Sequence, residues 1–186
     1  MLFTGKLRNV ALHAPERERI QLNDIILIGM PGSGKSTAGV LAAKAACKSF
    51  VDTDLLIQQA EGASLQVLLE GGGYEAFLAC EERVLLGVQE ENAVIATGGS
   101  AVYSEAGMAH LKTLGRTVYL HLSFEEMARR LGDIKTRGIV FREGQDLRQM
   151  YDDRLSLYKR YADVMIDCCG KTVEQTVADI LSALGI

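Results

Sequence analysis

The sequence predicts an α/β fold, a single domain in which a five-stranded parallel sheet is flanked by helices. Short apolar runs rich in β-branched residues recur along the 186-residue chain, and segments long enough to form helices separate them. A glycine-rich loop joins the first of these runs to the first helical segment. The length fits one domain with a substantial core.

The five predicted strands are short and apolar. The first, 24–29, reads Asp-Ile-Ile-Leu-Ile-Gly, a continuous run that is typical of a strand buried on both faces. The other four have the same character and lie at 49–52, 93–97, 117–122 and 163–166. Because parallel strands need long crossover connections, the helical segments between these runs favour a parallel sheet.

The predicted helices follow the strands in alternation. In 35–47 small and apolar residues recur at helical spacing, and most of the later segments are amphipathic. Those later segments are 55–69, 74–91, 105–114, 124–131, 147–161 and 173–184.

Two stretches fall outside this alternation. Residues 1–23 show no clear period, and we treat them as an N-terminal arm of unknown role before a domain at 24–186. Residues 132–146 are charged and punctuated by glycine, with Lys135, Arg137 and Arg142 among them. This composition predicts a mobile lid on the surface.

Composition excludes several classes of function. The chain has 20 Lys and Arg against 24 Asp and Glu, a net charge of −4, and no basic tract, so we expect no nucleic-acid partner. No apolar run approaches the roughly 18 residues that span a bilayer, so we expect no membrane partner. Four cysteines without a CxxC motif fit a reduced, cytoplasmic setting. We expect a monomer or weak homo-oligomer.

The strongest motif is a phosphate-binding loop at 29–36, Gly-Met-Pro-Gly-Ser-Gly-Lys-Ser, between a predicted strand and a predicted helix. Glycines let backbone N–H groups converge on phosphate oxygens, and a helix N-terminus adds further donors. Lys35 would reach the β- and γ-phosphates of ATP, and Ser36 would bind Mg²⁺. The predicted ATP-binding residues of this loop are Gly29, Gly32, Ser33, Gly34, Lys35, Ser36 and Thr37. A ligand-free helix cap is disfavoured by the complete pattern.

Two carboxylates follow the second strand in the run Asp52-Thr-Asp54. The carboxyl ends of parallel strands are where such sheets bind ligands, and the strand period of two places both side chains on one side. One could hold Mg²⁺ through water, and the other could orient an acceptor hydroxyl or accept its proton. An Asx turn or a helix N-cap is the competing interpretation, since Asp favours both positions.

A second glycine pair follows the third strand, at Gly98 and Gly99 in Thr97-Gly-Gly-Ser100. Glycine there permits close approach of a ligand, but a tight turn between strand and helix needs the same residues.

In their order, these landmarks resemble the shikimate kinase family, from about Ile25 to the C-terminus. The similar features are the loop at 29–36, Asp52 and Asp54, the stretch 73–81 with Phe77, Gly98-Gly99, Arg129-Arg130, Arg137 and Arg154 four residues before Tyr158. The resemblance implies a single P-loop kinase domain with ATP as co-substrate, Mg²⁺ as cofactor and a place in amino-acid biosynthesis.

The resemblance also implies roles for single residues. Asp52 would serve Mg²⁺ with Ser36, and Asp54 would hold the acceptor's hydroxyls beside Gly98 and Gly99. Three arginines follow: Arg130 would stack on adenine, Arg137 would move in with the lid as a catalytic residue beside Lys35 and Asp54, and Arg154 would bind the acceptor's carboxylate. Pairing of Arg154 with a neighbouring helix acid is the alternative.

The sequence departs from the family pattern on the acceptor side. Leu78 stands where the family has a second carboxylate-binding arginine, and Tyr74, Ser100 and Gly138 replace a glutamate, a glycine and a proline. Losing such a partner costs on the order of 2–5 kcal/mol if nothing substitutes. Either another donor compensates, with Ser100, Arg83 and Arg142 as candidates, or the acceptor differs. A hydroxy amino acid such as homoserine would suit the second case, with its ammonium near Asp54, Glu75 or Glu81.

The favoured function is ATP-dependent phosphorylation of a hydroxyl on a small carboxylate metabolite, with shikimate ahead of another hydroxy acid or homoserine. A nucleoside or nucleotide kinase would need a base-reading pocket, for which the sequence shows no aromatic and amide set. A nucleotide-binding regulatory domain without kinase activity would explain Leu78 and Ser100 but not the retention of Asp54 and Arg137.

Overall fold

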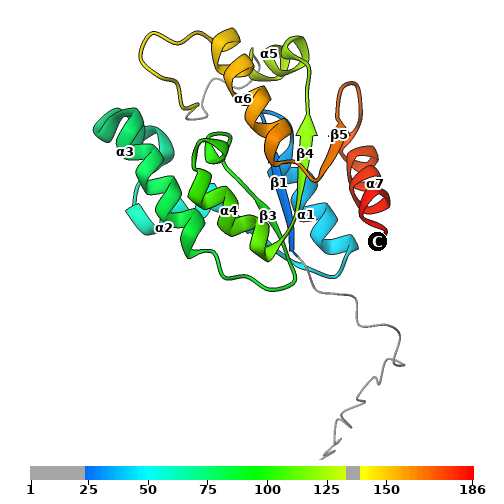
Figure 1. Cartoon of the computed structure of the whole chain (residues 1–186). Helices are drawn as coiled ribbons and strands as arrows, with labels where there is room; N and C mark the ends of the chain where they lie inside the picture. Colours follow the sequence, from blue (N-terminus) through cyan, green and yellow to red (C-terminus); the bar gives the residue numbers. More distant parts are fainter. Residues whose placement is uncertain (1–23, 133–138) are drawn as a thin grey trace, which may run out of the picture.

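The computed structural model describes residues 24–132 and 139–186, and within them a parallel sheet has the strand order β2-β3-β1-β4-β5 (Figure 1). The strands are β1 (Asp24–Gly29), β2 (Ser49–Asp52), β3 (Ala93–Ala96), β4 (Gly115–His121) and β5 (Val164–Asp167). The predicted fold class and all five predicted strands are confirmed, with ends shifted by at most two residues.

Strand β1 is the centre of the sheet because its side chains are apolar on both faces. All six of its residues are buried, and Ile26 pairs with Ile95 of β3 on one side and Thr117 of β4 on the other. At its start the Asp24 carboxylate accepts a hydrogen bond of 2.8 Å from the backbone N–H of Ala93. The strand therefore carries the chain through the core and delivers Gly29 to the carboxyl edge of the sheet.

Helices cover both faces of the sheet (Figure 1). Helices α1 and α7 pack together on one face, and α4 and α6 lie on the other. Crossovers between parallel strands are right-handed, so the helix changes face when the direction along the sheet reverses. The chain moves one way from β1 to β2 and the opposite way from β3 to β4. The helices are α1 (Lys35–Ala45), α2 (Thr53–Glu61), α3 (Leu65–Gly87), α4 (Glu105–Leu114), α5 (Phe124–Gly132), α6 (Leu147–Tyr161) and α7 (Val173–Leu184), with a 3₁₀ turn at Ala101–Tyr103.

The prediction of one helix over 55–69 was wrong, because the segment is two helices. Gly62 has a positive φ of 65° and ends α2 in the left-handed region, and the Ser64 hydroxyl accepts from the backbone N–H of Val67 to begin α3. The next predicted helix, 74–91, was also misplaced. Helix α3 already begins at Leu65, is interrupted by Gly73 at φ 75°, and ends at Gly87.

Helix α6 has a well-defined start. Asp146 accepts a hydrogen bond from the backbone N–H of Gln149, whose side chain in turn accepts from the backbone N–H of Asp146. This capping box satisfies two donors of the first turn. It sets the point at which the helix begins and so the positions of Arg154 and Tyr158 further along it.

Several predictions lie outside the described residues. These are the N-terminal arm at 1–23 and, within the predicted lid, residues 133–138 with Arg137. Of the rest of the predicted lid, Gly132 is the last residue of α5, and 139–146 is a non-helical stretch that leads into α6. No helix in the part of the chain that the structure describes is long and apolar enough to cross a membrane.

Candidate active site

The phosphate loop runs from the end of β1 to the start of α1. Gly32 and Gly34 have φ values of 80° and 90°, a region that other residues rarely adopt. At Gly29 a Cβ atom would lie 2.6 Å from the carbonyl oxygen of Leu120, so the neighbouring strand leaves no space for a side chain. These three glycines are therefore required by the path of the loop.

Lys35 is the first residue of α1, and its side chain is buried in the loop. Its ammonium Nζ donates to the carbonyl oxygen of Gly29 at 2.7 Å and to that of Met30 at 3.1 Å. The positive charge is thus held at the N-terminus of a helix whose first N–H groups have no partners in the helix. This arrangement is suited to the phosphates of a nucleotide.

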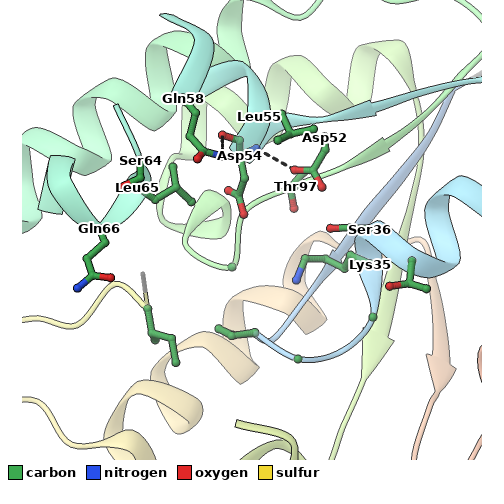
Figure 2. Close-up of a pocket in the computed structure, with 16 residues that line it drawn as sticks. Lys35, Ser36, Asp52, Asp54, Leu55, Gln58, Ser64, Leu65, Gln66 and Thr97 are labelled. Carbon is green, nitrogen blue, oxygen red and sulfur yellow. Dashed lines mark hydrogen bonds between the residues drawn. The ribbon is translucent and has the colours of Figure 1, made fainter. Parts of the chain in front are cut away.

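A cavity of about 360 Å³ lies between this loop and α2. Figure 2 shows Lys35 and Ser36 on the loop side, with Asp52, Asp54 and Thr97 across the cavity. Eight predicted site residues line it: Gly32, Gly34, Lys35, Ser36, Thr37, Asp52, Asp54 and Gly99. Five lining residues were not predicted. Leu55 and Gln58 lie on α2, whereas Ser64, Leu65 and Gln66 reach the cavity because the chain turns at Gly62 instead of continuing as a helix.

Asp52 and Asp54 both face the cavity, but not for the predicted reason. Asp52 ends β2 and caps α2, and its Oδ1 accepts from the backbone N–H of Asp54 at 3.0 Å. Asp54 lies in the first helical turn, so the strand period of two does not apply to the pair. The N-cap interpretation of Asp52 was correct, and it leaves the other carboxylate oxygen available.

The oxygen donors beside the loop fit Mg²⁺ that arrives with a nucleotide. Ser36 and Asp52 both line the cavity, and within 24–132 and 139–186 no group of three or more His, Cys, Asp or Glu side chains could hold a metal by itself. Mg²⁺ commonly takes one or two protein oxygens and completes its shell with substrate phosphates and water. The donor set is therefore suited to a nucleotide-bound metal.

A second cavity, of about 30 Å³, adjoins the first, since both are lined by Asp54 and Gly99. It is closed by Ile139 and Val140 from the stretch before α6, and Val140 is 4% exposed. This space holds at most a few water molecules.

Arg154 lines the second cavity and is 1% exposed. Its guanidinium donates to the carbonyl oxygen of Val140 and, at 3.3 Å, to the hydroxyl of Tyr103, whose ring centroid lies 5.2 Å away. The two acids that precede it in sequence have other partners, since Asp152 accepts from Arg148 and Asp153 accepts from Gln145. Arg154 thus points into the cavity with neutral partners, as an anion-binding arginine would.

Glu81 was considered in the sequence only as an ammonium partner, and the structure buries it completely on α3. A Cβ atom on Gly98 would collide with Glu81 Oε1 and lie 2.8 Å from Asp54 Oδ1, so both carboxylates press against that glycine. Burial raises the pKa of Glu81 to about 7, with a further increase from the nearby Asp54 charge and opposing effects of Ser100 and Arg154. Within the part of the chain that the structure describes, its Oε1 has no hydrogen-bond partner.

Leu78, the position of the missing arginine, lines neither cavity. It is half-buried in an apolar cluster with Ile57, Phe77 and Val140, of which Phe77 and Val140 line the second cavity. Leu78 therefore lies one residue away from the space it was predicted to face.

Of the three candidate substitutes, Ser100 alone lines the second cavity. Arg83 is exposed and pairs with Glu61. Arg142 lies over the rings of Tyr74 and Tyr103, with centroid distances of 5.9 and 5.3 Å, and donates to the Tyr74 hydroxyl.

Arg130 joins the phosphate loop to the end of β5. Its guanidinium donates to the carbonyl oxygens of Gly32 at 3.2 Å and Cys168 at 3.1 Å, and Glu126 accepts from its Nε at 2.7 Å. The side chain of Arg130 thus contacts the phosphate loop directly, and its predicted stacking on adenine stays a prediction.

The comparisons with known proteins agree with this geometry. A family model described as shikimate kinase matches residues 31–185. The chain belongs to the shikimate kinase family. The shikimate kinase of Pseudomonas paraeruginosa is 35% identical over 164 residues, covering 87% of this chain and 95% of the relative. That of Aquifex aeolicus is 34% identical over 161 residues, covering 86% and 95%.

Solved structures of shikimate kinases share the fold. The enzyme from Acinetobacter baumannii, in complex with shikimate, has a TM-score of 0.79 and 29% identity, covering 88% of this chain and 93% of that one. The enzyme from Aquifex aeolicus has a TM-score of 0.74 and 32% identity, covering 87% and 96%. The family assignment thus rests on sequence and on fold.

The buried carboxyl group of Glu81 makes stability depend on pH. Because its pKa rises from 4.5 to about 7 on folding, the folded state keeps the proton that the unfolded state releases. Glu81 therefore does not lower the free energy of unfolding below pH 4.5, where it is protonated in both states. As the pH rises from 4.5 to about 7, this free energy falls by roughly 3 kcal/mol. We predict that Glu81→Gln removes most of this loss, measured as the unfolding free energy in urea at pH 4.5, 6 and 7.5.

Glu75→Gln, at an exposed position of the same helix, is the control. It should keep the pH dependence of the original protein. The same pH dependence in Glu81→Gln would show that Glu81 is ionised in the folded state throughout this range.

Proposed function

We propose that this chain transfers the γ-phosphoryl group of ATP to a hydroxyl of shikimate, forming shikimate 3-phosphate. The observation that carries the proposal is the pair of adjoining cavities, which leads from Lys35 in the phosphate loop past Asp54 to the buried guanidinium of Arg154. Relatives named shikimate kinase, and a solved relative in complex with shikimate, support this choice of acceptor.

The phosphate loop supplies the nucleotide half of the reaction. Backbone N–H groups of the loop and of the first turn of α1 bind the phosphates, and Lys35 exchanges its carbonyl partners for phosphate oxygens. Ser36 and Asp52 would hold Mg²⁺, which neutralises charge on the phosphates when it is bound. Because charge moves toward the leaving oxygen during transfer, a lysine fixed at this point stabilises the transition state more than the bound substrate.

Asp54 and Arg154 supply the acceptor half. Arg154 binds the carboxylate and so fixes the acceptor's orientation, while Asp54 accepts the hydrogen bond of the reacting hydroxyl and can take its proton. Asp54 lies at the junction of the two cavities, where a hydroxyl would face the γ-phosphate. We also propose that Arg137, which lies outside the described residues, approaches the transferring group from the lid.

A hydroxy amino acid such as homoserine is the second candidate acceptor. The apolar Leu78 favours it, because a leucine leaves the acceptor region with less positive charge than a second arginine would. Glu81 Oε1 also favours it, because it has no hydrogen-bond partner among the described residues. An ammonium group would be repelled by a second arginine and attracted by Asp54 and Glu81.

The test of the proposed function is ATP consumption measured with shikimate, homoserine, gluconate and nucleosides. We expect the highest kcat/KM with shikimate. Highest turnover with homoserine would establish the second candidate, and ATP binding without turnover on any acceptor would indicate a regulatory nucleotide-binding domain. We propose that the reaction takes place in the cytoplasm, where ATP is available, and that the chain acts as a monomer or weak homo-oligomer.

Lys35→Ala is predicted to lower kcat by about 100-fold or more, because it removes a charge that acts chiefly in the transition state. Steady-state kinetics at saturating ATP measure the effect. Lys44→Ala, at an exposed position near the end of the same helix, should keep full activity. Unchanged phosphoryl transfer in Lys35→Ala would rule out the proposed role of the loop.

Leu78→Arg is predicted to raise kcat/KM for shikimate relative to homoserine by at least about 10-fold, equal to about 1.4 kcal/mol. Position 78 follows Phe77, which lines the second cavity. A guanidinium group there would attract the carboxylate of an acceptor and repel an ammonium group. The ratio of kcat/KM for the two acceptors, measured on both proteins, reports the change.

Leu68→Arg places the same charge in the same apolar cluster, at a position whose neighbours in sequence do not line the second cavity, and should leave the ratio unchanged. An unchanged ratio in Leu78→Arg itself would mean that the position has no influence on the acceptor.

A further inference from the structure

The hydroxyl group of Tyr158 lies between the two halves of the site. Tyr158 is a fully buried residue of α6, and its hydroxyl is 2.9 Å from the carbonyl oxygen of Gly29 and 2.6 Å from that of Gly99. Gly29 begins the phosphate loop, whereas Gly99 lines the cavity that holds Arg154. One hydroxyl group therefore contacts the nucleotide side and the acceptor side together.

This hydroxyl has one proton for two carbonyl groups. Burial raises the pKa of Tyr158 far above its ordinary value, so the group remains a hydrogen-bond donor at any working pH. Its ring is stacked on Tyr119, with centroids 5.0 Å apart and planes 14° from parallel, so the oxygen atom is fixed in place. The proton can rotate between the two carbonyl groups, but a full hydrogen bond forms to one at a time.

The position of Lys35 determines which of the two carbonyl groups has another hydrogen-bond donor. The ammonium of Lys35 already donates to the Gly29 carbonyl oxygen at 2.7 Å, closer than the Tyr158 hydroxyl at 2.9 Å. At Gly99 the hydroxyl is closer still, at 2.6 Å. In this arrangement, therefore, the Lys35 ammonium donates to the Gly29 carbonyl oxygen and the Tyr158 hydroxyl donates to the Gly99 carbonyl oxygen.

A nucleotide would change this distribution. Phosphate oxygens attract the Lys35 ammonium more strongly than neutral carbonyl groups do, so binding withdraws a donor from the buried Gly29 carbonyl. A buried carbonyl group without a donor is costly, and the Tyr158 proton is the nearest replacement. When that proton turns to Gly29, the Gly99 carbonyl loses its bond to Tyr158.

The Gly99 turn is in a position to pass this change to the acceptor. A Cβ atom on Gly99 would lie 3.1 Å from Pro31 of the phosphate loop and 3.2 Å from Nη1 of Arg154. The turn therefore lies in close contact with both groups. A carbonyl group released there can accept a hydrogen bond from a hydroxyl of the acceptor.

We propose that the Tyr158 hydroxyl is a positioning group that couples the two substrates, by exchanging its hydrogen bond from Gly99 to Gly29 when the nucleotide binds. Coupling of this kind is reciprocal, so each substrate tightens the binding of the other. As far as it concerns shikimate, this inference rests on the proposed function.

The first test compares shikimate affinity with and without a saturating non-hydrolysable ATP analogue and Mg²⁺, by calorimetry. In the original protein we expect the analogue to lower the Kd for shikimate by at least about 5-fold. In Tyr158→Phe the same analogue should change it by less than about 2-fold. Equal coupling in the two proteins, or no coupling in the original protein, would overturn the proposal.

Tyr151→Phe is the matched control. Tyr151 is a buried tyrosine of the same helix, and its hydroxyl donates to the carbonyl oxygen of Leu122 at 2.9 Å, away from the phosphate loop. Both variants lose one buried hydrogen bond, so we expect similar decreases in melting temperature. Only Tyr158→Phe should lose the coupling. Equal loss of coupling in Tyr151→Phe would show that the effect comes from a general loss of stability, and it would overturn the proposal.

A second test needs no acceptor and so separates this inference from the proposed function. Hydrogen exchange of the backbone amides at 98–101 is measured before and after addition of the ATP analogue. We expect the analogue to change exchange at this turn in the original protein and in Tyr151→Phe, but not in Tyr158→Phe. No change in the original protein would overturn the exchange of hydrogen bonds, whereas a change without shikimate binding would leave it in place and contradict only the proposed acceptor.

Discussion

The carboxyl ends of β1, β2 and β3 meet at one edge of the sheet, and the candidate site depends on this constraint. Parallel pairing brings Gly29, Asp52 and Thr97 to the same edge of the sheet, although they are far apart in sequence. Helices that leave this edge begin with unpaired N–H groups, so the same geometry supplies a phosphate site and holds polar side chains against it.

The parts of this arrangement that depend on local sequence could be predicted. Continuous β-branched runs identify buried strands, and the glycine and lysine spacing at 29–36 specifies a phosphate loop whatever surrounds it. The break at Gly62 was missed because apolar spacing continues through it, and the cap formed by Ser64 was visible only as a single residue type. The prediction that Asp54 belongs to the strand end was a similar error. Two carboxylates at this point look alike in the sequence whether or not a helix has begun.

The acceptor side depends on contacts between distant residues, which no local pattern reveals. Glu81 lies against Asp54 because α3 passes behind Gly98, and Tyr158 reaches two carbonyl groups because α6 crosses the end of β1. The sequence analysis named both residues as landmarks, but nothing near them in the sequence shows these contacts. Leu78 illustrates the opposite case, because the pattern marked its position as important whereas the structure places its side chain in an apolar cluster.

We propose that the phosphoryl group passes from the phosphate loop to a hydroxyl held at Asp54, and ³¹P NMR of the reaction mixture is the sharpest test of this transfer. With ATP, Mg²⁺ and shikimate, we expect a new phosphomonoester resonance that grows in equal amount with ADP, and little of it with Asp54→Asn. Release of the γ-phosphate as inorganic phosphate, or a phosphomonoester formed from homoserine but not from shikimate, would rule out this transfer.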